Sequence, residues 1–365
     1  MVKVAIIGTQ GVPAKYGGFE SLVENIIGDN CSDGIQYTVF CSGIDMDSKL
    51  KSYKGCRLKY VPLHANGMQS VPYDILSMMR TIRGYDTILI LGTSGCCFLP
   101  ILKRLCHARI IVNIDGIEHK REKWGKVAKW MLRHSEKAAV RYSDVIIADN
   151  KGISQYVKDT YGRDAEIIAY GGDNAVRDVS EQQQMEILRQ YGLESDSYAI
   201  TVCRIEPENN THIVLEAFKR NGRPLVYIGN WEHSNYARYL KKQYAEATNI
   251  RMLDSIYDLD TLYALRKHSH CYVHGHSAGG TNPSLVEAMS IGCRILCFDV
   301  VYNRETTHGK ALYFSDVESL TELLDTEWGD YSQMREIARR CYTWATIAKA
   351  YERLYTAQEK DRDSR

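Results

Sequence analysis

Short runs rich in Val and Ile alternate with longer segments of helical periodicity through most of the chain. Apolar runs that are each followed by an amphipathic segment are typical of parallel strands covered by helices on both faces. In the first half we predict strands at 2–8, 36–41, 58–63, 86–91, 109–114 and 144–148. The rhythm restarts after a polar, glycine-bearing segment, with strands predicted at 198–203, 224–229, 249–253, 271–275 and 294–298. The pattern therefore predicts an α/β protein with two doubly wound, Rossmann-like domains.

Domain boundaries follow from this repetition. The length of 365 residues suits two domains of ordinary size. We expect an N-terminal domain at 1–171, a C-terminal domain at 172–340, and a terminal helix at 341–365 that crosses back to the first domain. In doubly wound sheets, ligands bind beyond the carboxyl ends of the strands. We therefore expect the site in the loops after the strands, in a cleft between two facing domains.

The cysteines and the apolar runs favour a cytoplasmic protein. None of the eleven cysteines belongs to a C-x-x-C pair, so we expect reduced thiols rather than a zinc site. The N-terminus lacks the longer apolar region of a signal peptide. The most apolar stretch, 87–102, is interrupted by glycines and is shorter than the ~20 residues of a spanning helix.

The segment GTQGVPAKYGGFE at 8–20 joins the first predicted strand to a helix. Gly8, Gly11, Gly17 and Gly18 allow the backbone to approach a ligand closely, and the helix that follows presents its positive end to it. The spacing is not G-x-G-x-x-G, so it does not indicate a dinucleotide site. A loop that binds no ligand is the alternative.

The segment VCRIEPENNTH at 202–212 follows the first strand of the second domain. Arg204 is suited to donate a forked pair of hydrogen bonds to a diphosphate. The alternative is a surface arginine paired with Glu206 or Glu208. Gly229, at the end of the next strand, is included among the candidate binding residues.

The segment HGHSAGGTNPSLVEAMSIG at 274–292 predicts a strand end, a small polar loop and a helix that begins near Pro283. That arrangement aims backbone N–H groups at an anion. Glu287, one turn further along, is placed to accept hydrogen bonds from a ribose diol. Alternatively, its carboxylate only complements the helix dipole. The loop residues expected to bind substrate are His276, Gly279, Gly280, Thr281, Asn282 and Ser284.

These segments resemble the retaining GT-B glycosyltransferases of family 4, over nearly the whole chain. Four segments, GTQGVPAKYGGFE, NIDGIEHKREKW, RIEPENN and GGTNPSLVEAM, look like the bacterial rhamnosyltransferase branch that builds capsular and cell-wall polysaccharide. The resemblance implies a nucleotide-sugar donor, dTDP-rhamnose in that branch, and a retaining mechanism without a covalent enzyme intermediate. We expect no metal and no cofactor, because helix N-termini and Arg204 would take the place of a cation at the diphosphate.

Carried over to this sequence, the resemblance assigns Arg204 to the diphosphate and Glu287 to the ribose. The chain departs from the family at two positions. Gly279 stands where the first glutamate of the E-x7-E segment is usual, and Asn209 stands where a phosphate-binding lysine is usual. We expect His276, Asn209 or Asn210 to substitute, as an adjustment to the donor.

The loop NIDGIEH at 113–119 lies where many members of the family have a histidine near the reacting sugar. Here Asp115 takes that position, with Glu118 and His119 close behind. We expect Asp115 to orient an acceptor hydroxyl or to stabilise positive charge on the sugar ring. Alternatively, Asp115 caps the turn that follows.

The segment 119–141 is a basic helical stretch with interleaved Trp124, Trp130 and Met131. Basic charge with interfacial tryptophan fits docking on anionic lipid head groups. An ordinary crossover helix with one solvated basic face is the alternative. Residues 1–170 carry 23 basic and 17 acidic side chains, a net +6, whereas the remainder carries 23 and 28, a net −5. Because the whole chain is near neutral, the sequence disfavours nucleic acid as a partner.

The sequence thus predicts a cytoplasmic enzyme, peripheral at the inner face of the membrane, that transfers L-rhamnose from dTDP-rhamnose to a lipid-linked saccharide. One alternative is a glycosyltransferase that uses a UDP- or GDP-sugar. Another is a non-catalytic protein that binds nucleotide sugars. The absence of a G-x-G-x-x-G segment argues against a Rossmann oxidoreductase.

Overall fold

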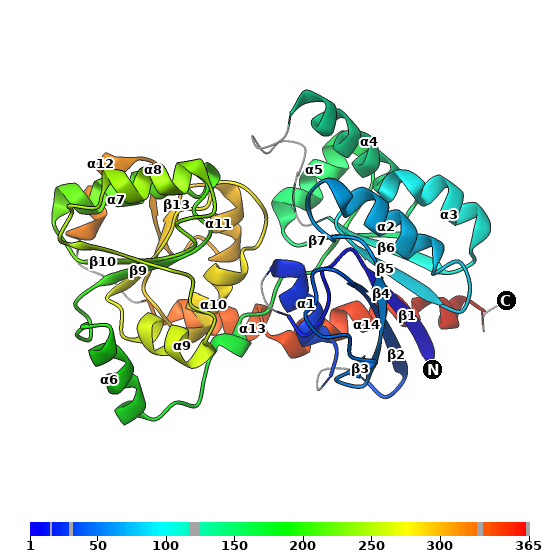
Figure 1. Cartoon of the computed structure of the whole chain (residues 1–365), viewed down its shortest axis with the longest axis horizontal. Helices are drawn as coiled ribbons and strands as arrows, with labels where there is room; N and C mark the ends of the chain where they lie inside the picture. The colour runs from blue at the N-terminus through cyan, green and yellow to red at the C-terminus, as the bar shows by residue number, and fades with distance from the viewer. Residues whose placement is uncertain (15–16, 29–31, 115, 117–124, 327–330, 363–365) are drawn as a thin grey trace. The chain divides into compact units, whose positions relative to one another are not determined.

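The computed structural model describes residues 1–14, 17–28, 32–114, 116, 125–326 and 331–362 (Figure 1). The chain forms two compact units. Unit 1 comprises Met1–Ala169 together with Trp344–Arg365, and unit 2 comprises Tyr170–Thr343. The chain therefore leaves unit 1 once and returns to it at its C-terminal helix.

Unit 1 is built on an eight-stranded sheet in the order β3-β4-β2-β1-β5-β6-β7-β8. Every neighbouring pair is parallel except β3 with β4. The central strands are almost wholly buried, as their continuous Val and Ile runs require of a sheet covered on both faces. The strands are β1 (Val2–Ile7), β2 (Ile35–Ser42), β3 (Ser52–Tyr53), β4 (Cys56–Val61), β5 (Thr87–Leu91), β6 (Arg109–Ile114), β7 (Val145–Ala148) and β8 (Glu166–Ile167).

Helices lie on both faces of this sheet, with α2 and α14 on opposite sides of β1 (Figure 1). The helix α14 also packs against α1. Its contacts to unit 1 are specific, because Asn113 Nδ2 donates to Tyr351 Oη at 2.6 Å and Ser32 N donates to Glu352 Oε1 at 2.7 Å. The helices are α1 (Gly18–Ile26), η1 (Gly67–Gln69), α2 (Ser70–Met79), η2 (Cys96–Phe98), α3 (Leu99–Leu105), α4 (Lys126–Tyr142), α5 (Lys151–Tyr161) and α14 (Trp344–Arg362).

Unit 2 is built on a six-stranded parallel sheet in the order β11-β10-β9-β12-β13-β14. Numbered within the unit, this order is 3-2-1-4-5-6, that of a doubly wound nucleotide-binding sheet. The strands are β9 (Ala199–Val202), β10 (Leu225–Ile228), β11 (Ile250–Leu253), β12 (Cys271–His274), β13 (Ile295–Phe298) and β14 (Leu312–Phe314).

Helices α7, α8 and α12 cover one face of this sheet, and α9, α10 and α13 cover the other (Figure 1). The first face encloses a core of Phe218, Tyr227 and Trp231 with aliphatic side chains around them. The helices of unit 2 are η4 (Asp173–Ala175), α6 (Glu181–Gln190), η5 (Pro207–Asn209), α7 (Thr211–Asn221), α8 (Asn235–Gln243), α9 (Leu259–Lys267), α10 (Pro283–Ile291), α11 (Val301–Thr306), α12 (Val317–Leu324) and α13 (Gln333–Cys341).

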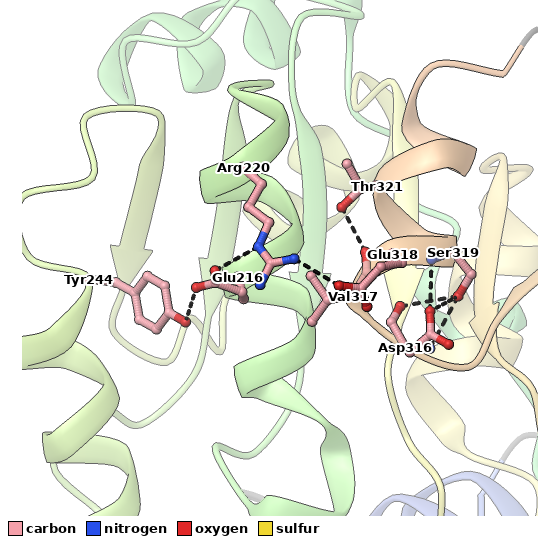
Figure 2. Close-up of polar contacts among 8 residues, drawn as sticks. All are labelled: Glu216, Arg220, Tyr244, Asp316, Val317, Glu318, Ser319 and Thr321. Carbon is pink, nitrogen blue, oxygen red and sulfur yellow. Dashed lines mark hydrogen bonds and ion pairs between the residues drawn. The ribbon is translucent and has the colours of Figure 1, made fainter.

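Polar side chains connect the helices α7, α8 and α12 on one face of the unit 2 sheet (Figure 2). Glu216 on α7 accepts hydrogen bonds from Arg220 Nε at 2.8 Å and from Tyr244 Oη, at the end of α8, at 2.9 Å. Arg220 also reaches Glu318 on α12 at 2.9 Å. Since α7 begins at the carboxyl end of β9 and runs back along the sheet, this network lies away from the loops that follow the strands.

Candidate functional site

The strand order of unit 2 reverses between β9 and β12. The chain leaves β9 toward β10 on one side, whereas β12 lies on the other side. Sheets of this kind bind ligands outside the carboxyl ends of the strands at such a reversal, and we call this region of unit 2 the crevice. Arg204, Asn209 and Asn210 follow β9, and the segment from His276 to Ser284 follows β12. The topology thus brings together most of the site residues predicted for the second domain.

The two loops are joined by hydrogen bonds. Asn210 Nδ2 donates to Gly275 O at 2.9 Å, and Ser277 N donates to Glu208 O at 2.8 Å. A Cβ at Gly275 would lie 2.3 Å from Asn209 O, so only glycine permits this approach. The loops therefore form one connected wall of the crevice.

The buried side chain of Asn209 stabilises the loop after β9. It is 3% exposed, and its Nδ2 donates to Arg204 O at 2.7 Å. Gly229, which follows β10, lets the backbone at Cys203 pack closely against it, since a Cβ at 229 would lie 2.5 Å from Cys203 O. In this structure both residues shape the backbone that carries Arg204.

Arg204 itself is exposed at the crevice edge. Among the described residues no acidic side chain forms an ion pair with it. Glu206, a partner considered in the sequence analysis, instead contacts His233 Nε2 at 3.1 Å. The guanidinium of Arg204 is thus able to receive an external anion.

The loop after β12 leads into the N-terminus of α10. Asn282 caps the helix, and its Oδ1 accepts from Ser284 N at 3.0 Å and from Ser284 Oγ at 2.8 Å. The N–H of Ser284 is therefore already bonded, and Thr281 is buried. Gly280 is partly exposed in the loop between them and His276.

Gly279 has a φ of +112°, and no atom lies within 4 Å of a Cβ placed there. There is room for a side chain at this position, but the backbone conformation disfavours any residue with a Cβ. The loop path therefore favours glycine at position 279.

His276 stacks on His274, with ring centroids 4.2 Å apart and ring planes 8° from parallel. His274 is buried in β12, and this burial lowers its pKa to about 3. The backbone of His276 is also held, since Asn303 Nδ2 donates to its carbonyl oxygen at 2.9 Å. A neutral imidazole at 274 thus supports the ring at 276.

Glu287 on α10 pairs with Arg266 on α9, and Arg266 Nη1 lies 2.9 Å from Glu287 Oε2. The side chain of Glu287 remains 21% exposed. The sequence analysis missed Arg266, because its position in an amphipathic helix gives no indication of an interior partner. Glu287 therefore does more than complement the dipole of α10.

In unit 1 the glycine-rich loop after β1 is held by α1. Glu20 Oε1 accepts from Thr9 Oγ1 at 3.0 Å and from Gln10 N at 2.8 Å. Gly17, the N-cap, and Gly18 begin the helix close to this carboxylate. The negative charge of Glu20 already occupies the positive end of α1.

The remaining predicted site residues, Asp115, Glu118 and His119, lie outside the described residues. So does the basic segment as far as residue 124. Where side chains are described, no group of three His, Cys, Asp or Glu could hold a metal ion. None of the described helices is both long and apolar enough to cross a membrane.

The architecture and the crevice define the class of protein. Two Rossmann-like α/β units with parallel sheets constitute the GT-B fold of glycosyltransferases, which confirms the predicted fold class. Residues 183–336, which make up most of unit 2, match the family model described as glycosyl transferases group 1. Residues 1–173 match a model described as a domain of unknown function, DUF1972. No curated protein is significantly similar to the chain.

Solved structures of the same fold match nearly the whole chain. Sucrose-phosphate synthase from Thermosynechococcus elongatus has a TM-score of 0.82 and 16% identity, over 99% of this chain and 100% of its own. HepE from Anabaena, in complex with UDP-glucose, has a TM-score of 0.78 and 16% identity, over 98% and 100%. The catalytic domain of starch synthase IV from Arabidopsis thaliana, bound to ADP and acarbose, has a TM-score of 0.69 and 14% identity, over 98% and 99%.

Proposed function

We propose that the protein is a retaining glycosyltransferase that moves L-rhamnose from dTDP-rhamnose to a lipid-linked saccharide in surface polysaccharide synthesis. The observation that carries the proposal is the exposed Arg204, without a described acidic partner, in the crevice between β9 and β12 of a glycosyl transferases group 1 domain. HepE, which has the same fold, was solved with UDP-glucose, and this supports a nucleotide-sugar donor. Rhamnose and dTDP rest on the resemblance of the four sequence segments.

In this proposal each residue has a distinct task. Arg204 donates parallel hydrogen bonds to the diphosphate and offsets the charge that develops as it leaves. Glu287 accepts a hydrogen bond from the nucleoside sugar. The loop from His276 to Ser284 surrounds the transferred sugar, and Asp115, with Glu118 and His119 close behind, orients the acceptor hydroxyl.

The acceptor is lipid-linked, so part of the protein must lie close to the membrane. We assign this contact to α4, where Val127 is 82% exposed and Trp130 is 63% exposed. Lys126, Arg133 and Lys137 are exposed on the same helix. The enzyme would thus be cytoplasmic and peripheral at the inner membrane face.

Thermal shifts with dTDP-rhamnose, UDP-glucose, UDP-N-acetylglucosamine, GDP-mannose and NAD test the donor. A ligand at about 100 times its Kd stabilises the native state by about 2.7 kcal/mol, which raises the melting temperature by several degrees. We expect the largest shift with dTDP-rhamnose. A shift with only a UDP- or GDP-sugar would mean that the donor is that nucleotide sugar and not dTDP-rhamnose. A shift with NAD alone would overturn the proposal.

Variants connect binding to the crevice. Arg204→Ala should weaken donor binding by roughly 10- to 100-fold, because a hydrogen bond to a charged group contributes about 1.5–3 kcal/mol. Arg220→Ala, on the far part of α7, is the matched control and should keep the full ligand-induced shift. Sugar release in the presence of acceptor separates an enzyme from a non-catalytic binding protein.

A further inference from the structure

Glu206 is the acidic residue closest to Arg204 in the sequence, only two positions further on. The N–H of Glu206 donates to Arg204 O at 3.1 Å, which closes a three-residue γ-turn. Ile205, the middle residue of this turn, is fully buried, whereas Arg204 is exposed and Glu206 is partly exposed. The turn therefore brings two long side chains of opposite charge close together at the edge of the crevice.

The carboxylate of Glu206 nevertheless pairs with His233, in the loop after β10. Its Oε1 lies 3.1 Å from His233 Nε2, and the side chains of Glu206 and His233 are 20% and 53% exposed. An imidazole can donate a hydrogen bond to a carboxylate in its neutral form as well as in its protonated form. The pair therefore does not depend on a positive charge at His233, whereas a pair with Arg204 would join two full charges.

The backbone on both sides of His233 is held in place. Trp231, two residues before it, is fully buried, and its Nε1 donates to Leu253 O at 3.0 Å. Ser234, the next residue, is the N-cap of α8. Forming an exposed ion pair usually costs side-chain and backbone freedom. Because the loop is already ordered around His233, the histidine can hold Glu206 with a smaller loss of freedom.

We infer that His233 is a positioning residue that holds Glu206 away from Arg204 and so keeps the guanidinium available to a diphosphate. This inference rests on the proposed function, because it assumes that Arg204 binds the diphosphate of the donor. A carboxylate paired with Arg204 would occupy some of its N–H donors and would repel an approaching anion. The pair between His233 and Glu206 therefore influences how tightly the crevice binds nucleoside diphosphates.

Calorimetric titration of the full-length chain with UDP and with dTDP measures this influence. His233→Ala should raise the Kd of both nucleotides about two- to fivefold, because the released Glu206 pairs with Arg204 and an exposed ion pair corresponds to a factor of up to about five. His233→Gln, whose amide N–H can still donate to Glu206, should bind nearly as tightly as the wild type. His64→Ala is the matched control, since His64 is a similarly exposed histidine that pairs with Asp45 in unit 1. Its Kd values should equal those of the wild type.

A double variant distinguishes positioning from a direct contact with the nucleotide. Glu206→Gln removes the charge that competes for Arg204, so His233→Ala combined with Glu206→Gln should bind as tightly as Glu206→Gln alone. If His233 contacted the nucleotide itself, or only stabilised its loop, the loss of affinity would persist in the double variant and the inference would be wrong.

Wild-type affinity in His233→Ala would also overturn the inference. In either case, nucleotide binding by the wild type would leave the proposed function intact. If the wild type binds neither UDP, nor dTDP, nor any nucleotide sugar, the proposed function itself fails.

Discussion

Asp74 is a carboxyl group buried beneath the loop after β5, at the reversal point of the unit 1 sheet. Its Oδ2 accepts a hydrogen bond from Gly95 N at 3.1 Å. Burial raises its pKa to about 7, although the Gly95 bond opposes the shift. The folded chain therefore holds a proton that the unfolded chain releases near pH 4.

This raised pKa predicts a pH dependence with a definite sign. Between about pH 4 and pH 7 the unfolded state binds fewer protons, so Asp74 lowers the free energy of unfolding by up to about 1.4 kcal/mol per pH unit as pH rises. Asp74→Asn should remove this contribution, and its stability advantage over the wild type should grow from pH 5 to pH 8 in chemical denaturation. The exposed Asp159→Asn serves as the control, and an equal advantage at both values would contradict the assignment.

The same scale shows how far the sequence identifies site residues. Arg204 and Glu287 stay predictions, and the sequence offers them because Arg204 follows a strand and Glu287 lies in the helix after another strand, where parallel sheets bind ligands. Arg266 and Asp74 could not be predicted, since their roles depend on contacts between elements far apart in the sequence. Gly279 was recognised as a departure from a family, but only its φ of +112° supplies the physical reason.

At the scale of elements, α4 combines a core face with an exposed face. Leu132, Ala139 and Val140 are buried, as an ordinary crossover helix requires, yet Val127 and Trp130 are exposed. We expect Trp130→Ser to weaken binding to vesicles containing anionic phospholipid by about tenfold, because an inserted aromatic side chain contributes on the order of 1–2 kcal/mol. Vesicle sedimentation measures this. Tyr239→Ser, an exposed aromatic substitution on α8, should have no effect, and equal binding of all three proteins would exclude α4 as the contact.

The length of a strand determined whether the hydrophobic pattern of the sequence predicted it. Runs such as Val2–Ile7 and Arg109–Ile114 are long enough to show a buried strand. The strands β3, β8 and β14 were missed, because segments of two or three residues carry no periodicity. Their pairing depends on the neighbouring strand rather than on their own sequence.

At the scale of the molecule, unit 1 depends on the last helix of the chain. Trp344, Ile347, Tyr351 and Tyr355 are buried there. Each such side chain contributes roughly 1.5–3 kcal/mol, and their sum is comparable to the 5–15 kcal/mol that stabilises a typical domain. A chain ending at Thr343 should lose hydrogen-exchange protection throughout unit 1 but keep it in unit 2. A chain ending at Arg362 is the control, and full protection of unit 1 in the shorter chain would contradict this dependence.

The return of α14 also sets an order of events during synthesis on the ribosome. The side chain of Asn113 can form its hydrogen bond to Tyr351 only after Tyr351 has been synthesised, 238 residues later. Unit 2 is continuous from Tyr170 to Thr343, so all its strands have been made before α14 is translated. Although domains made first generally fold first, here the first unit to be started is the last to be completed.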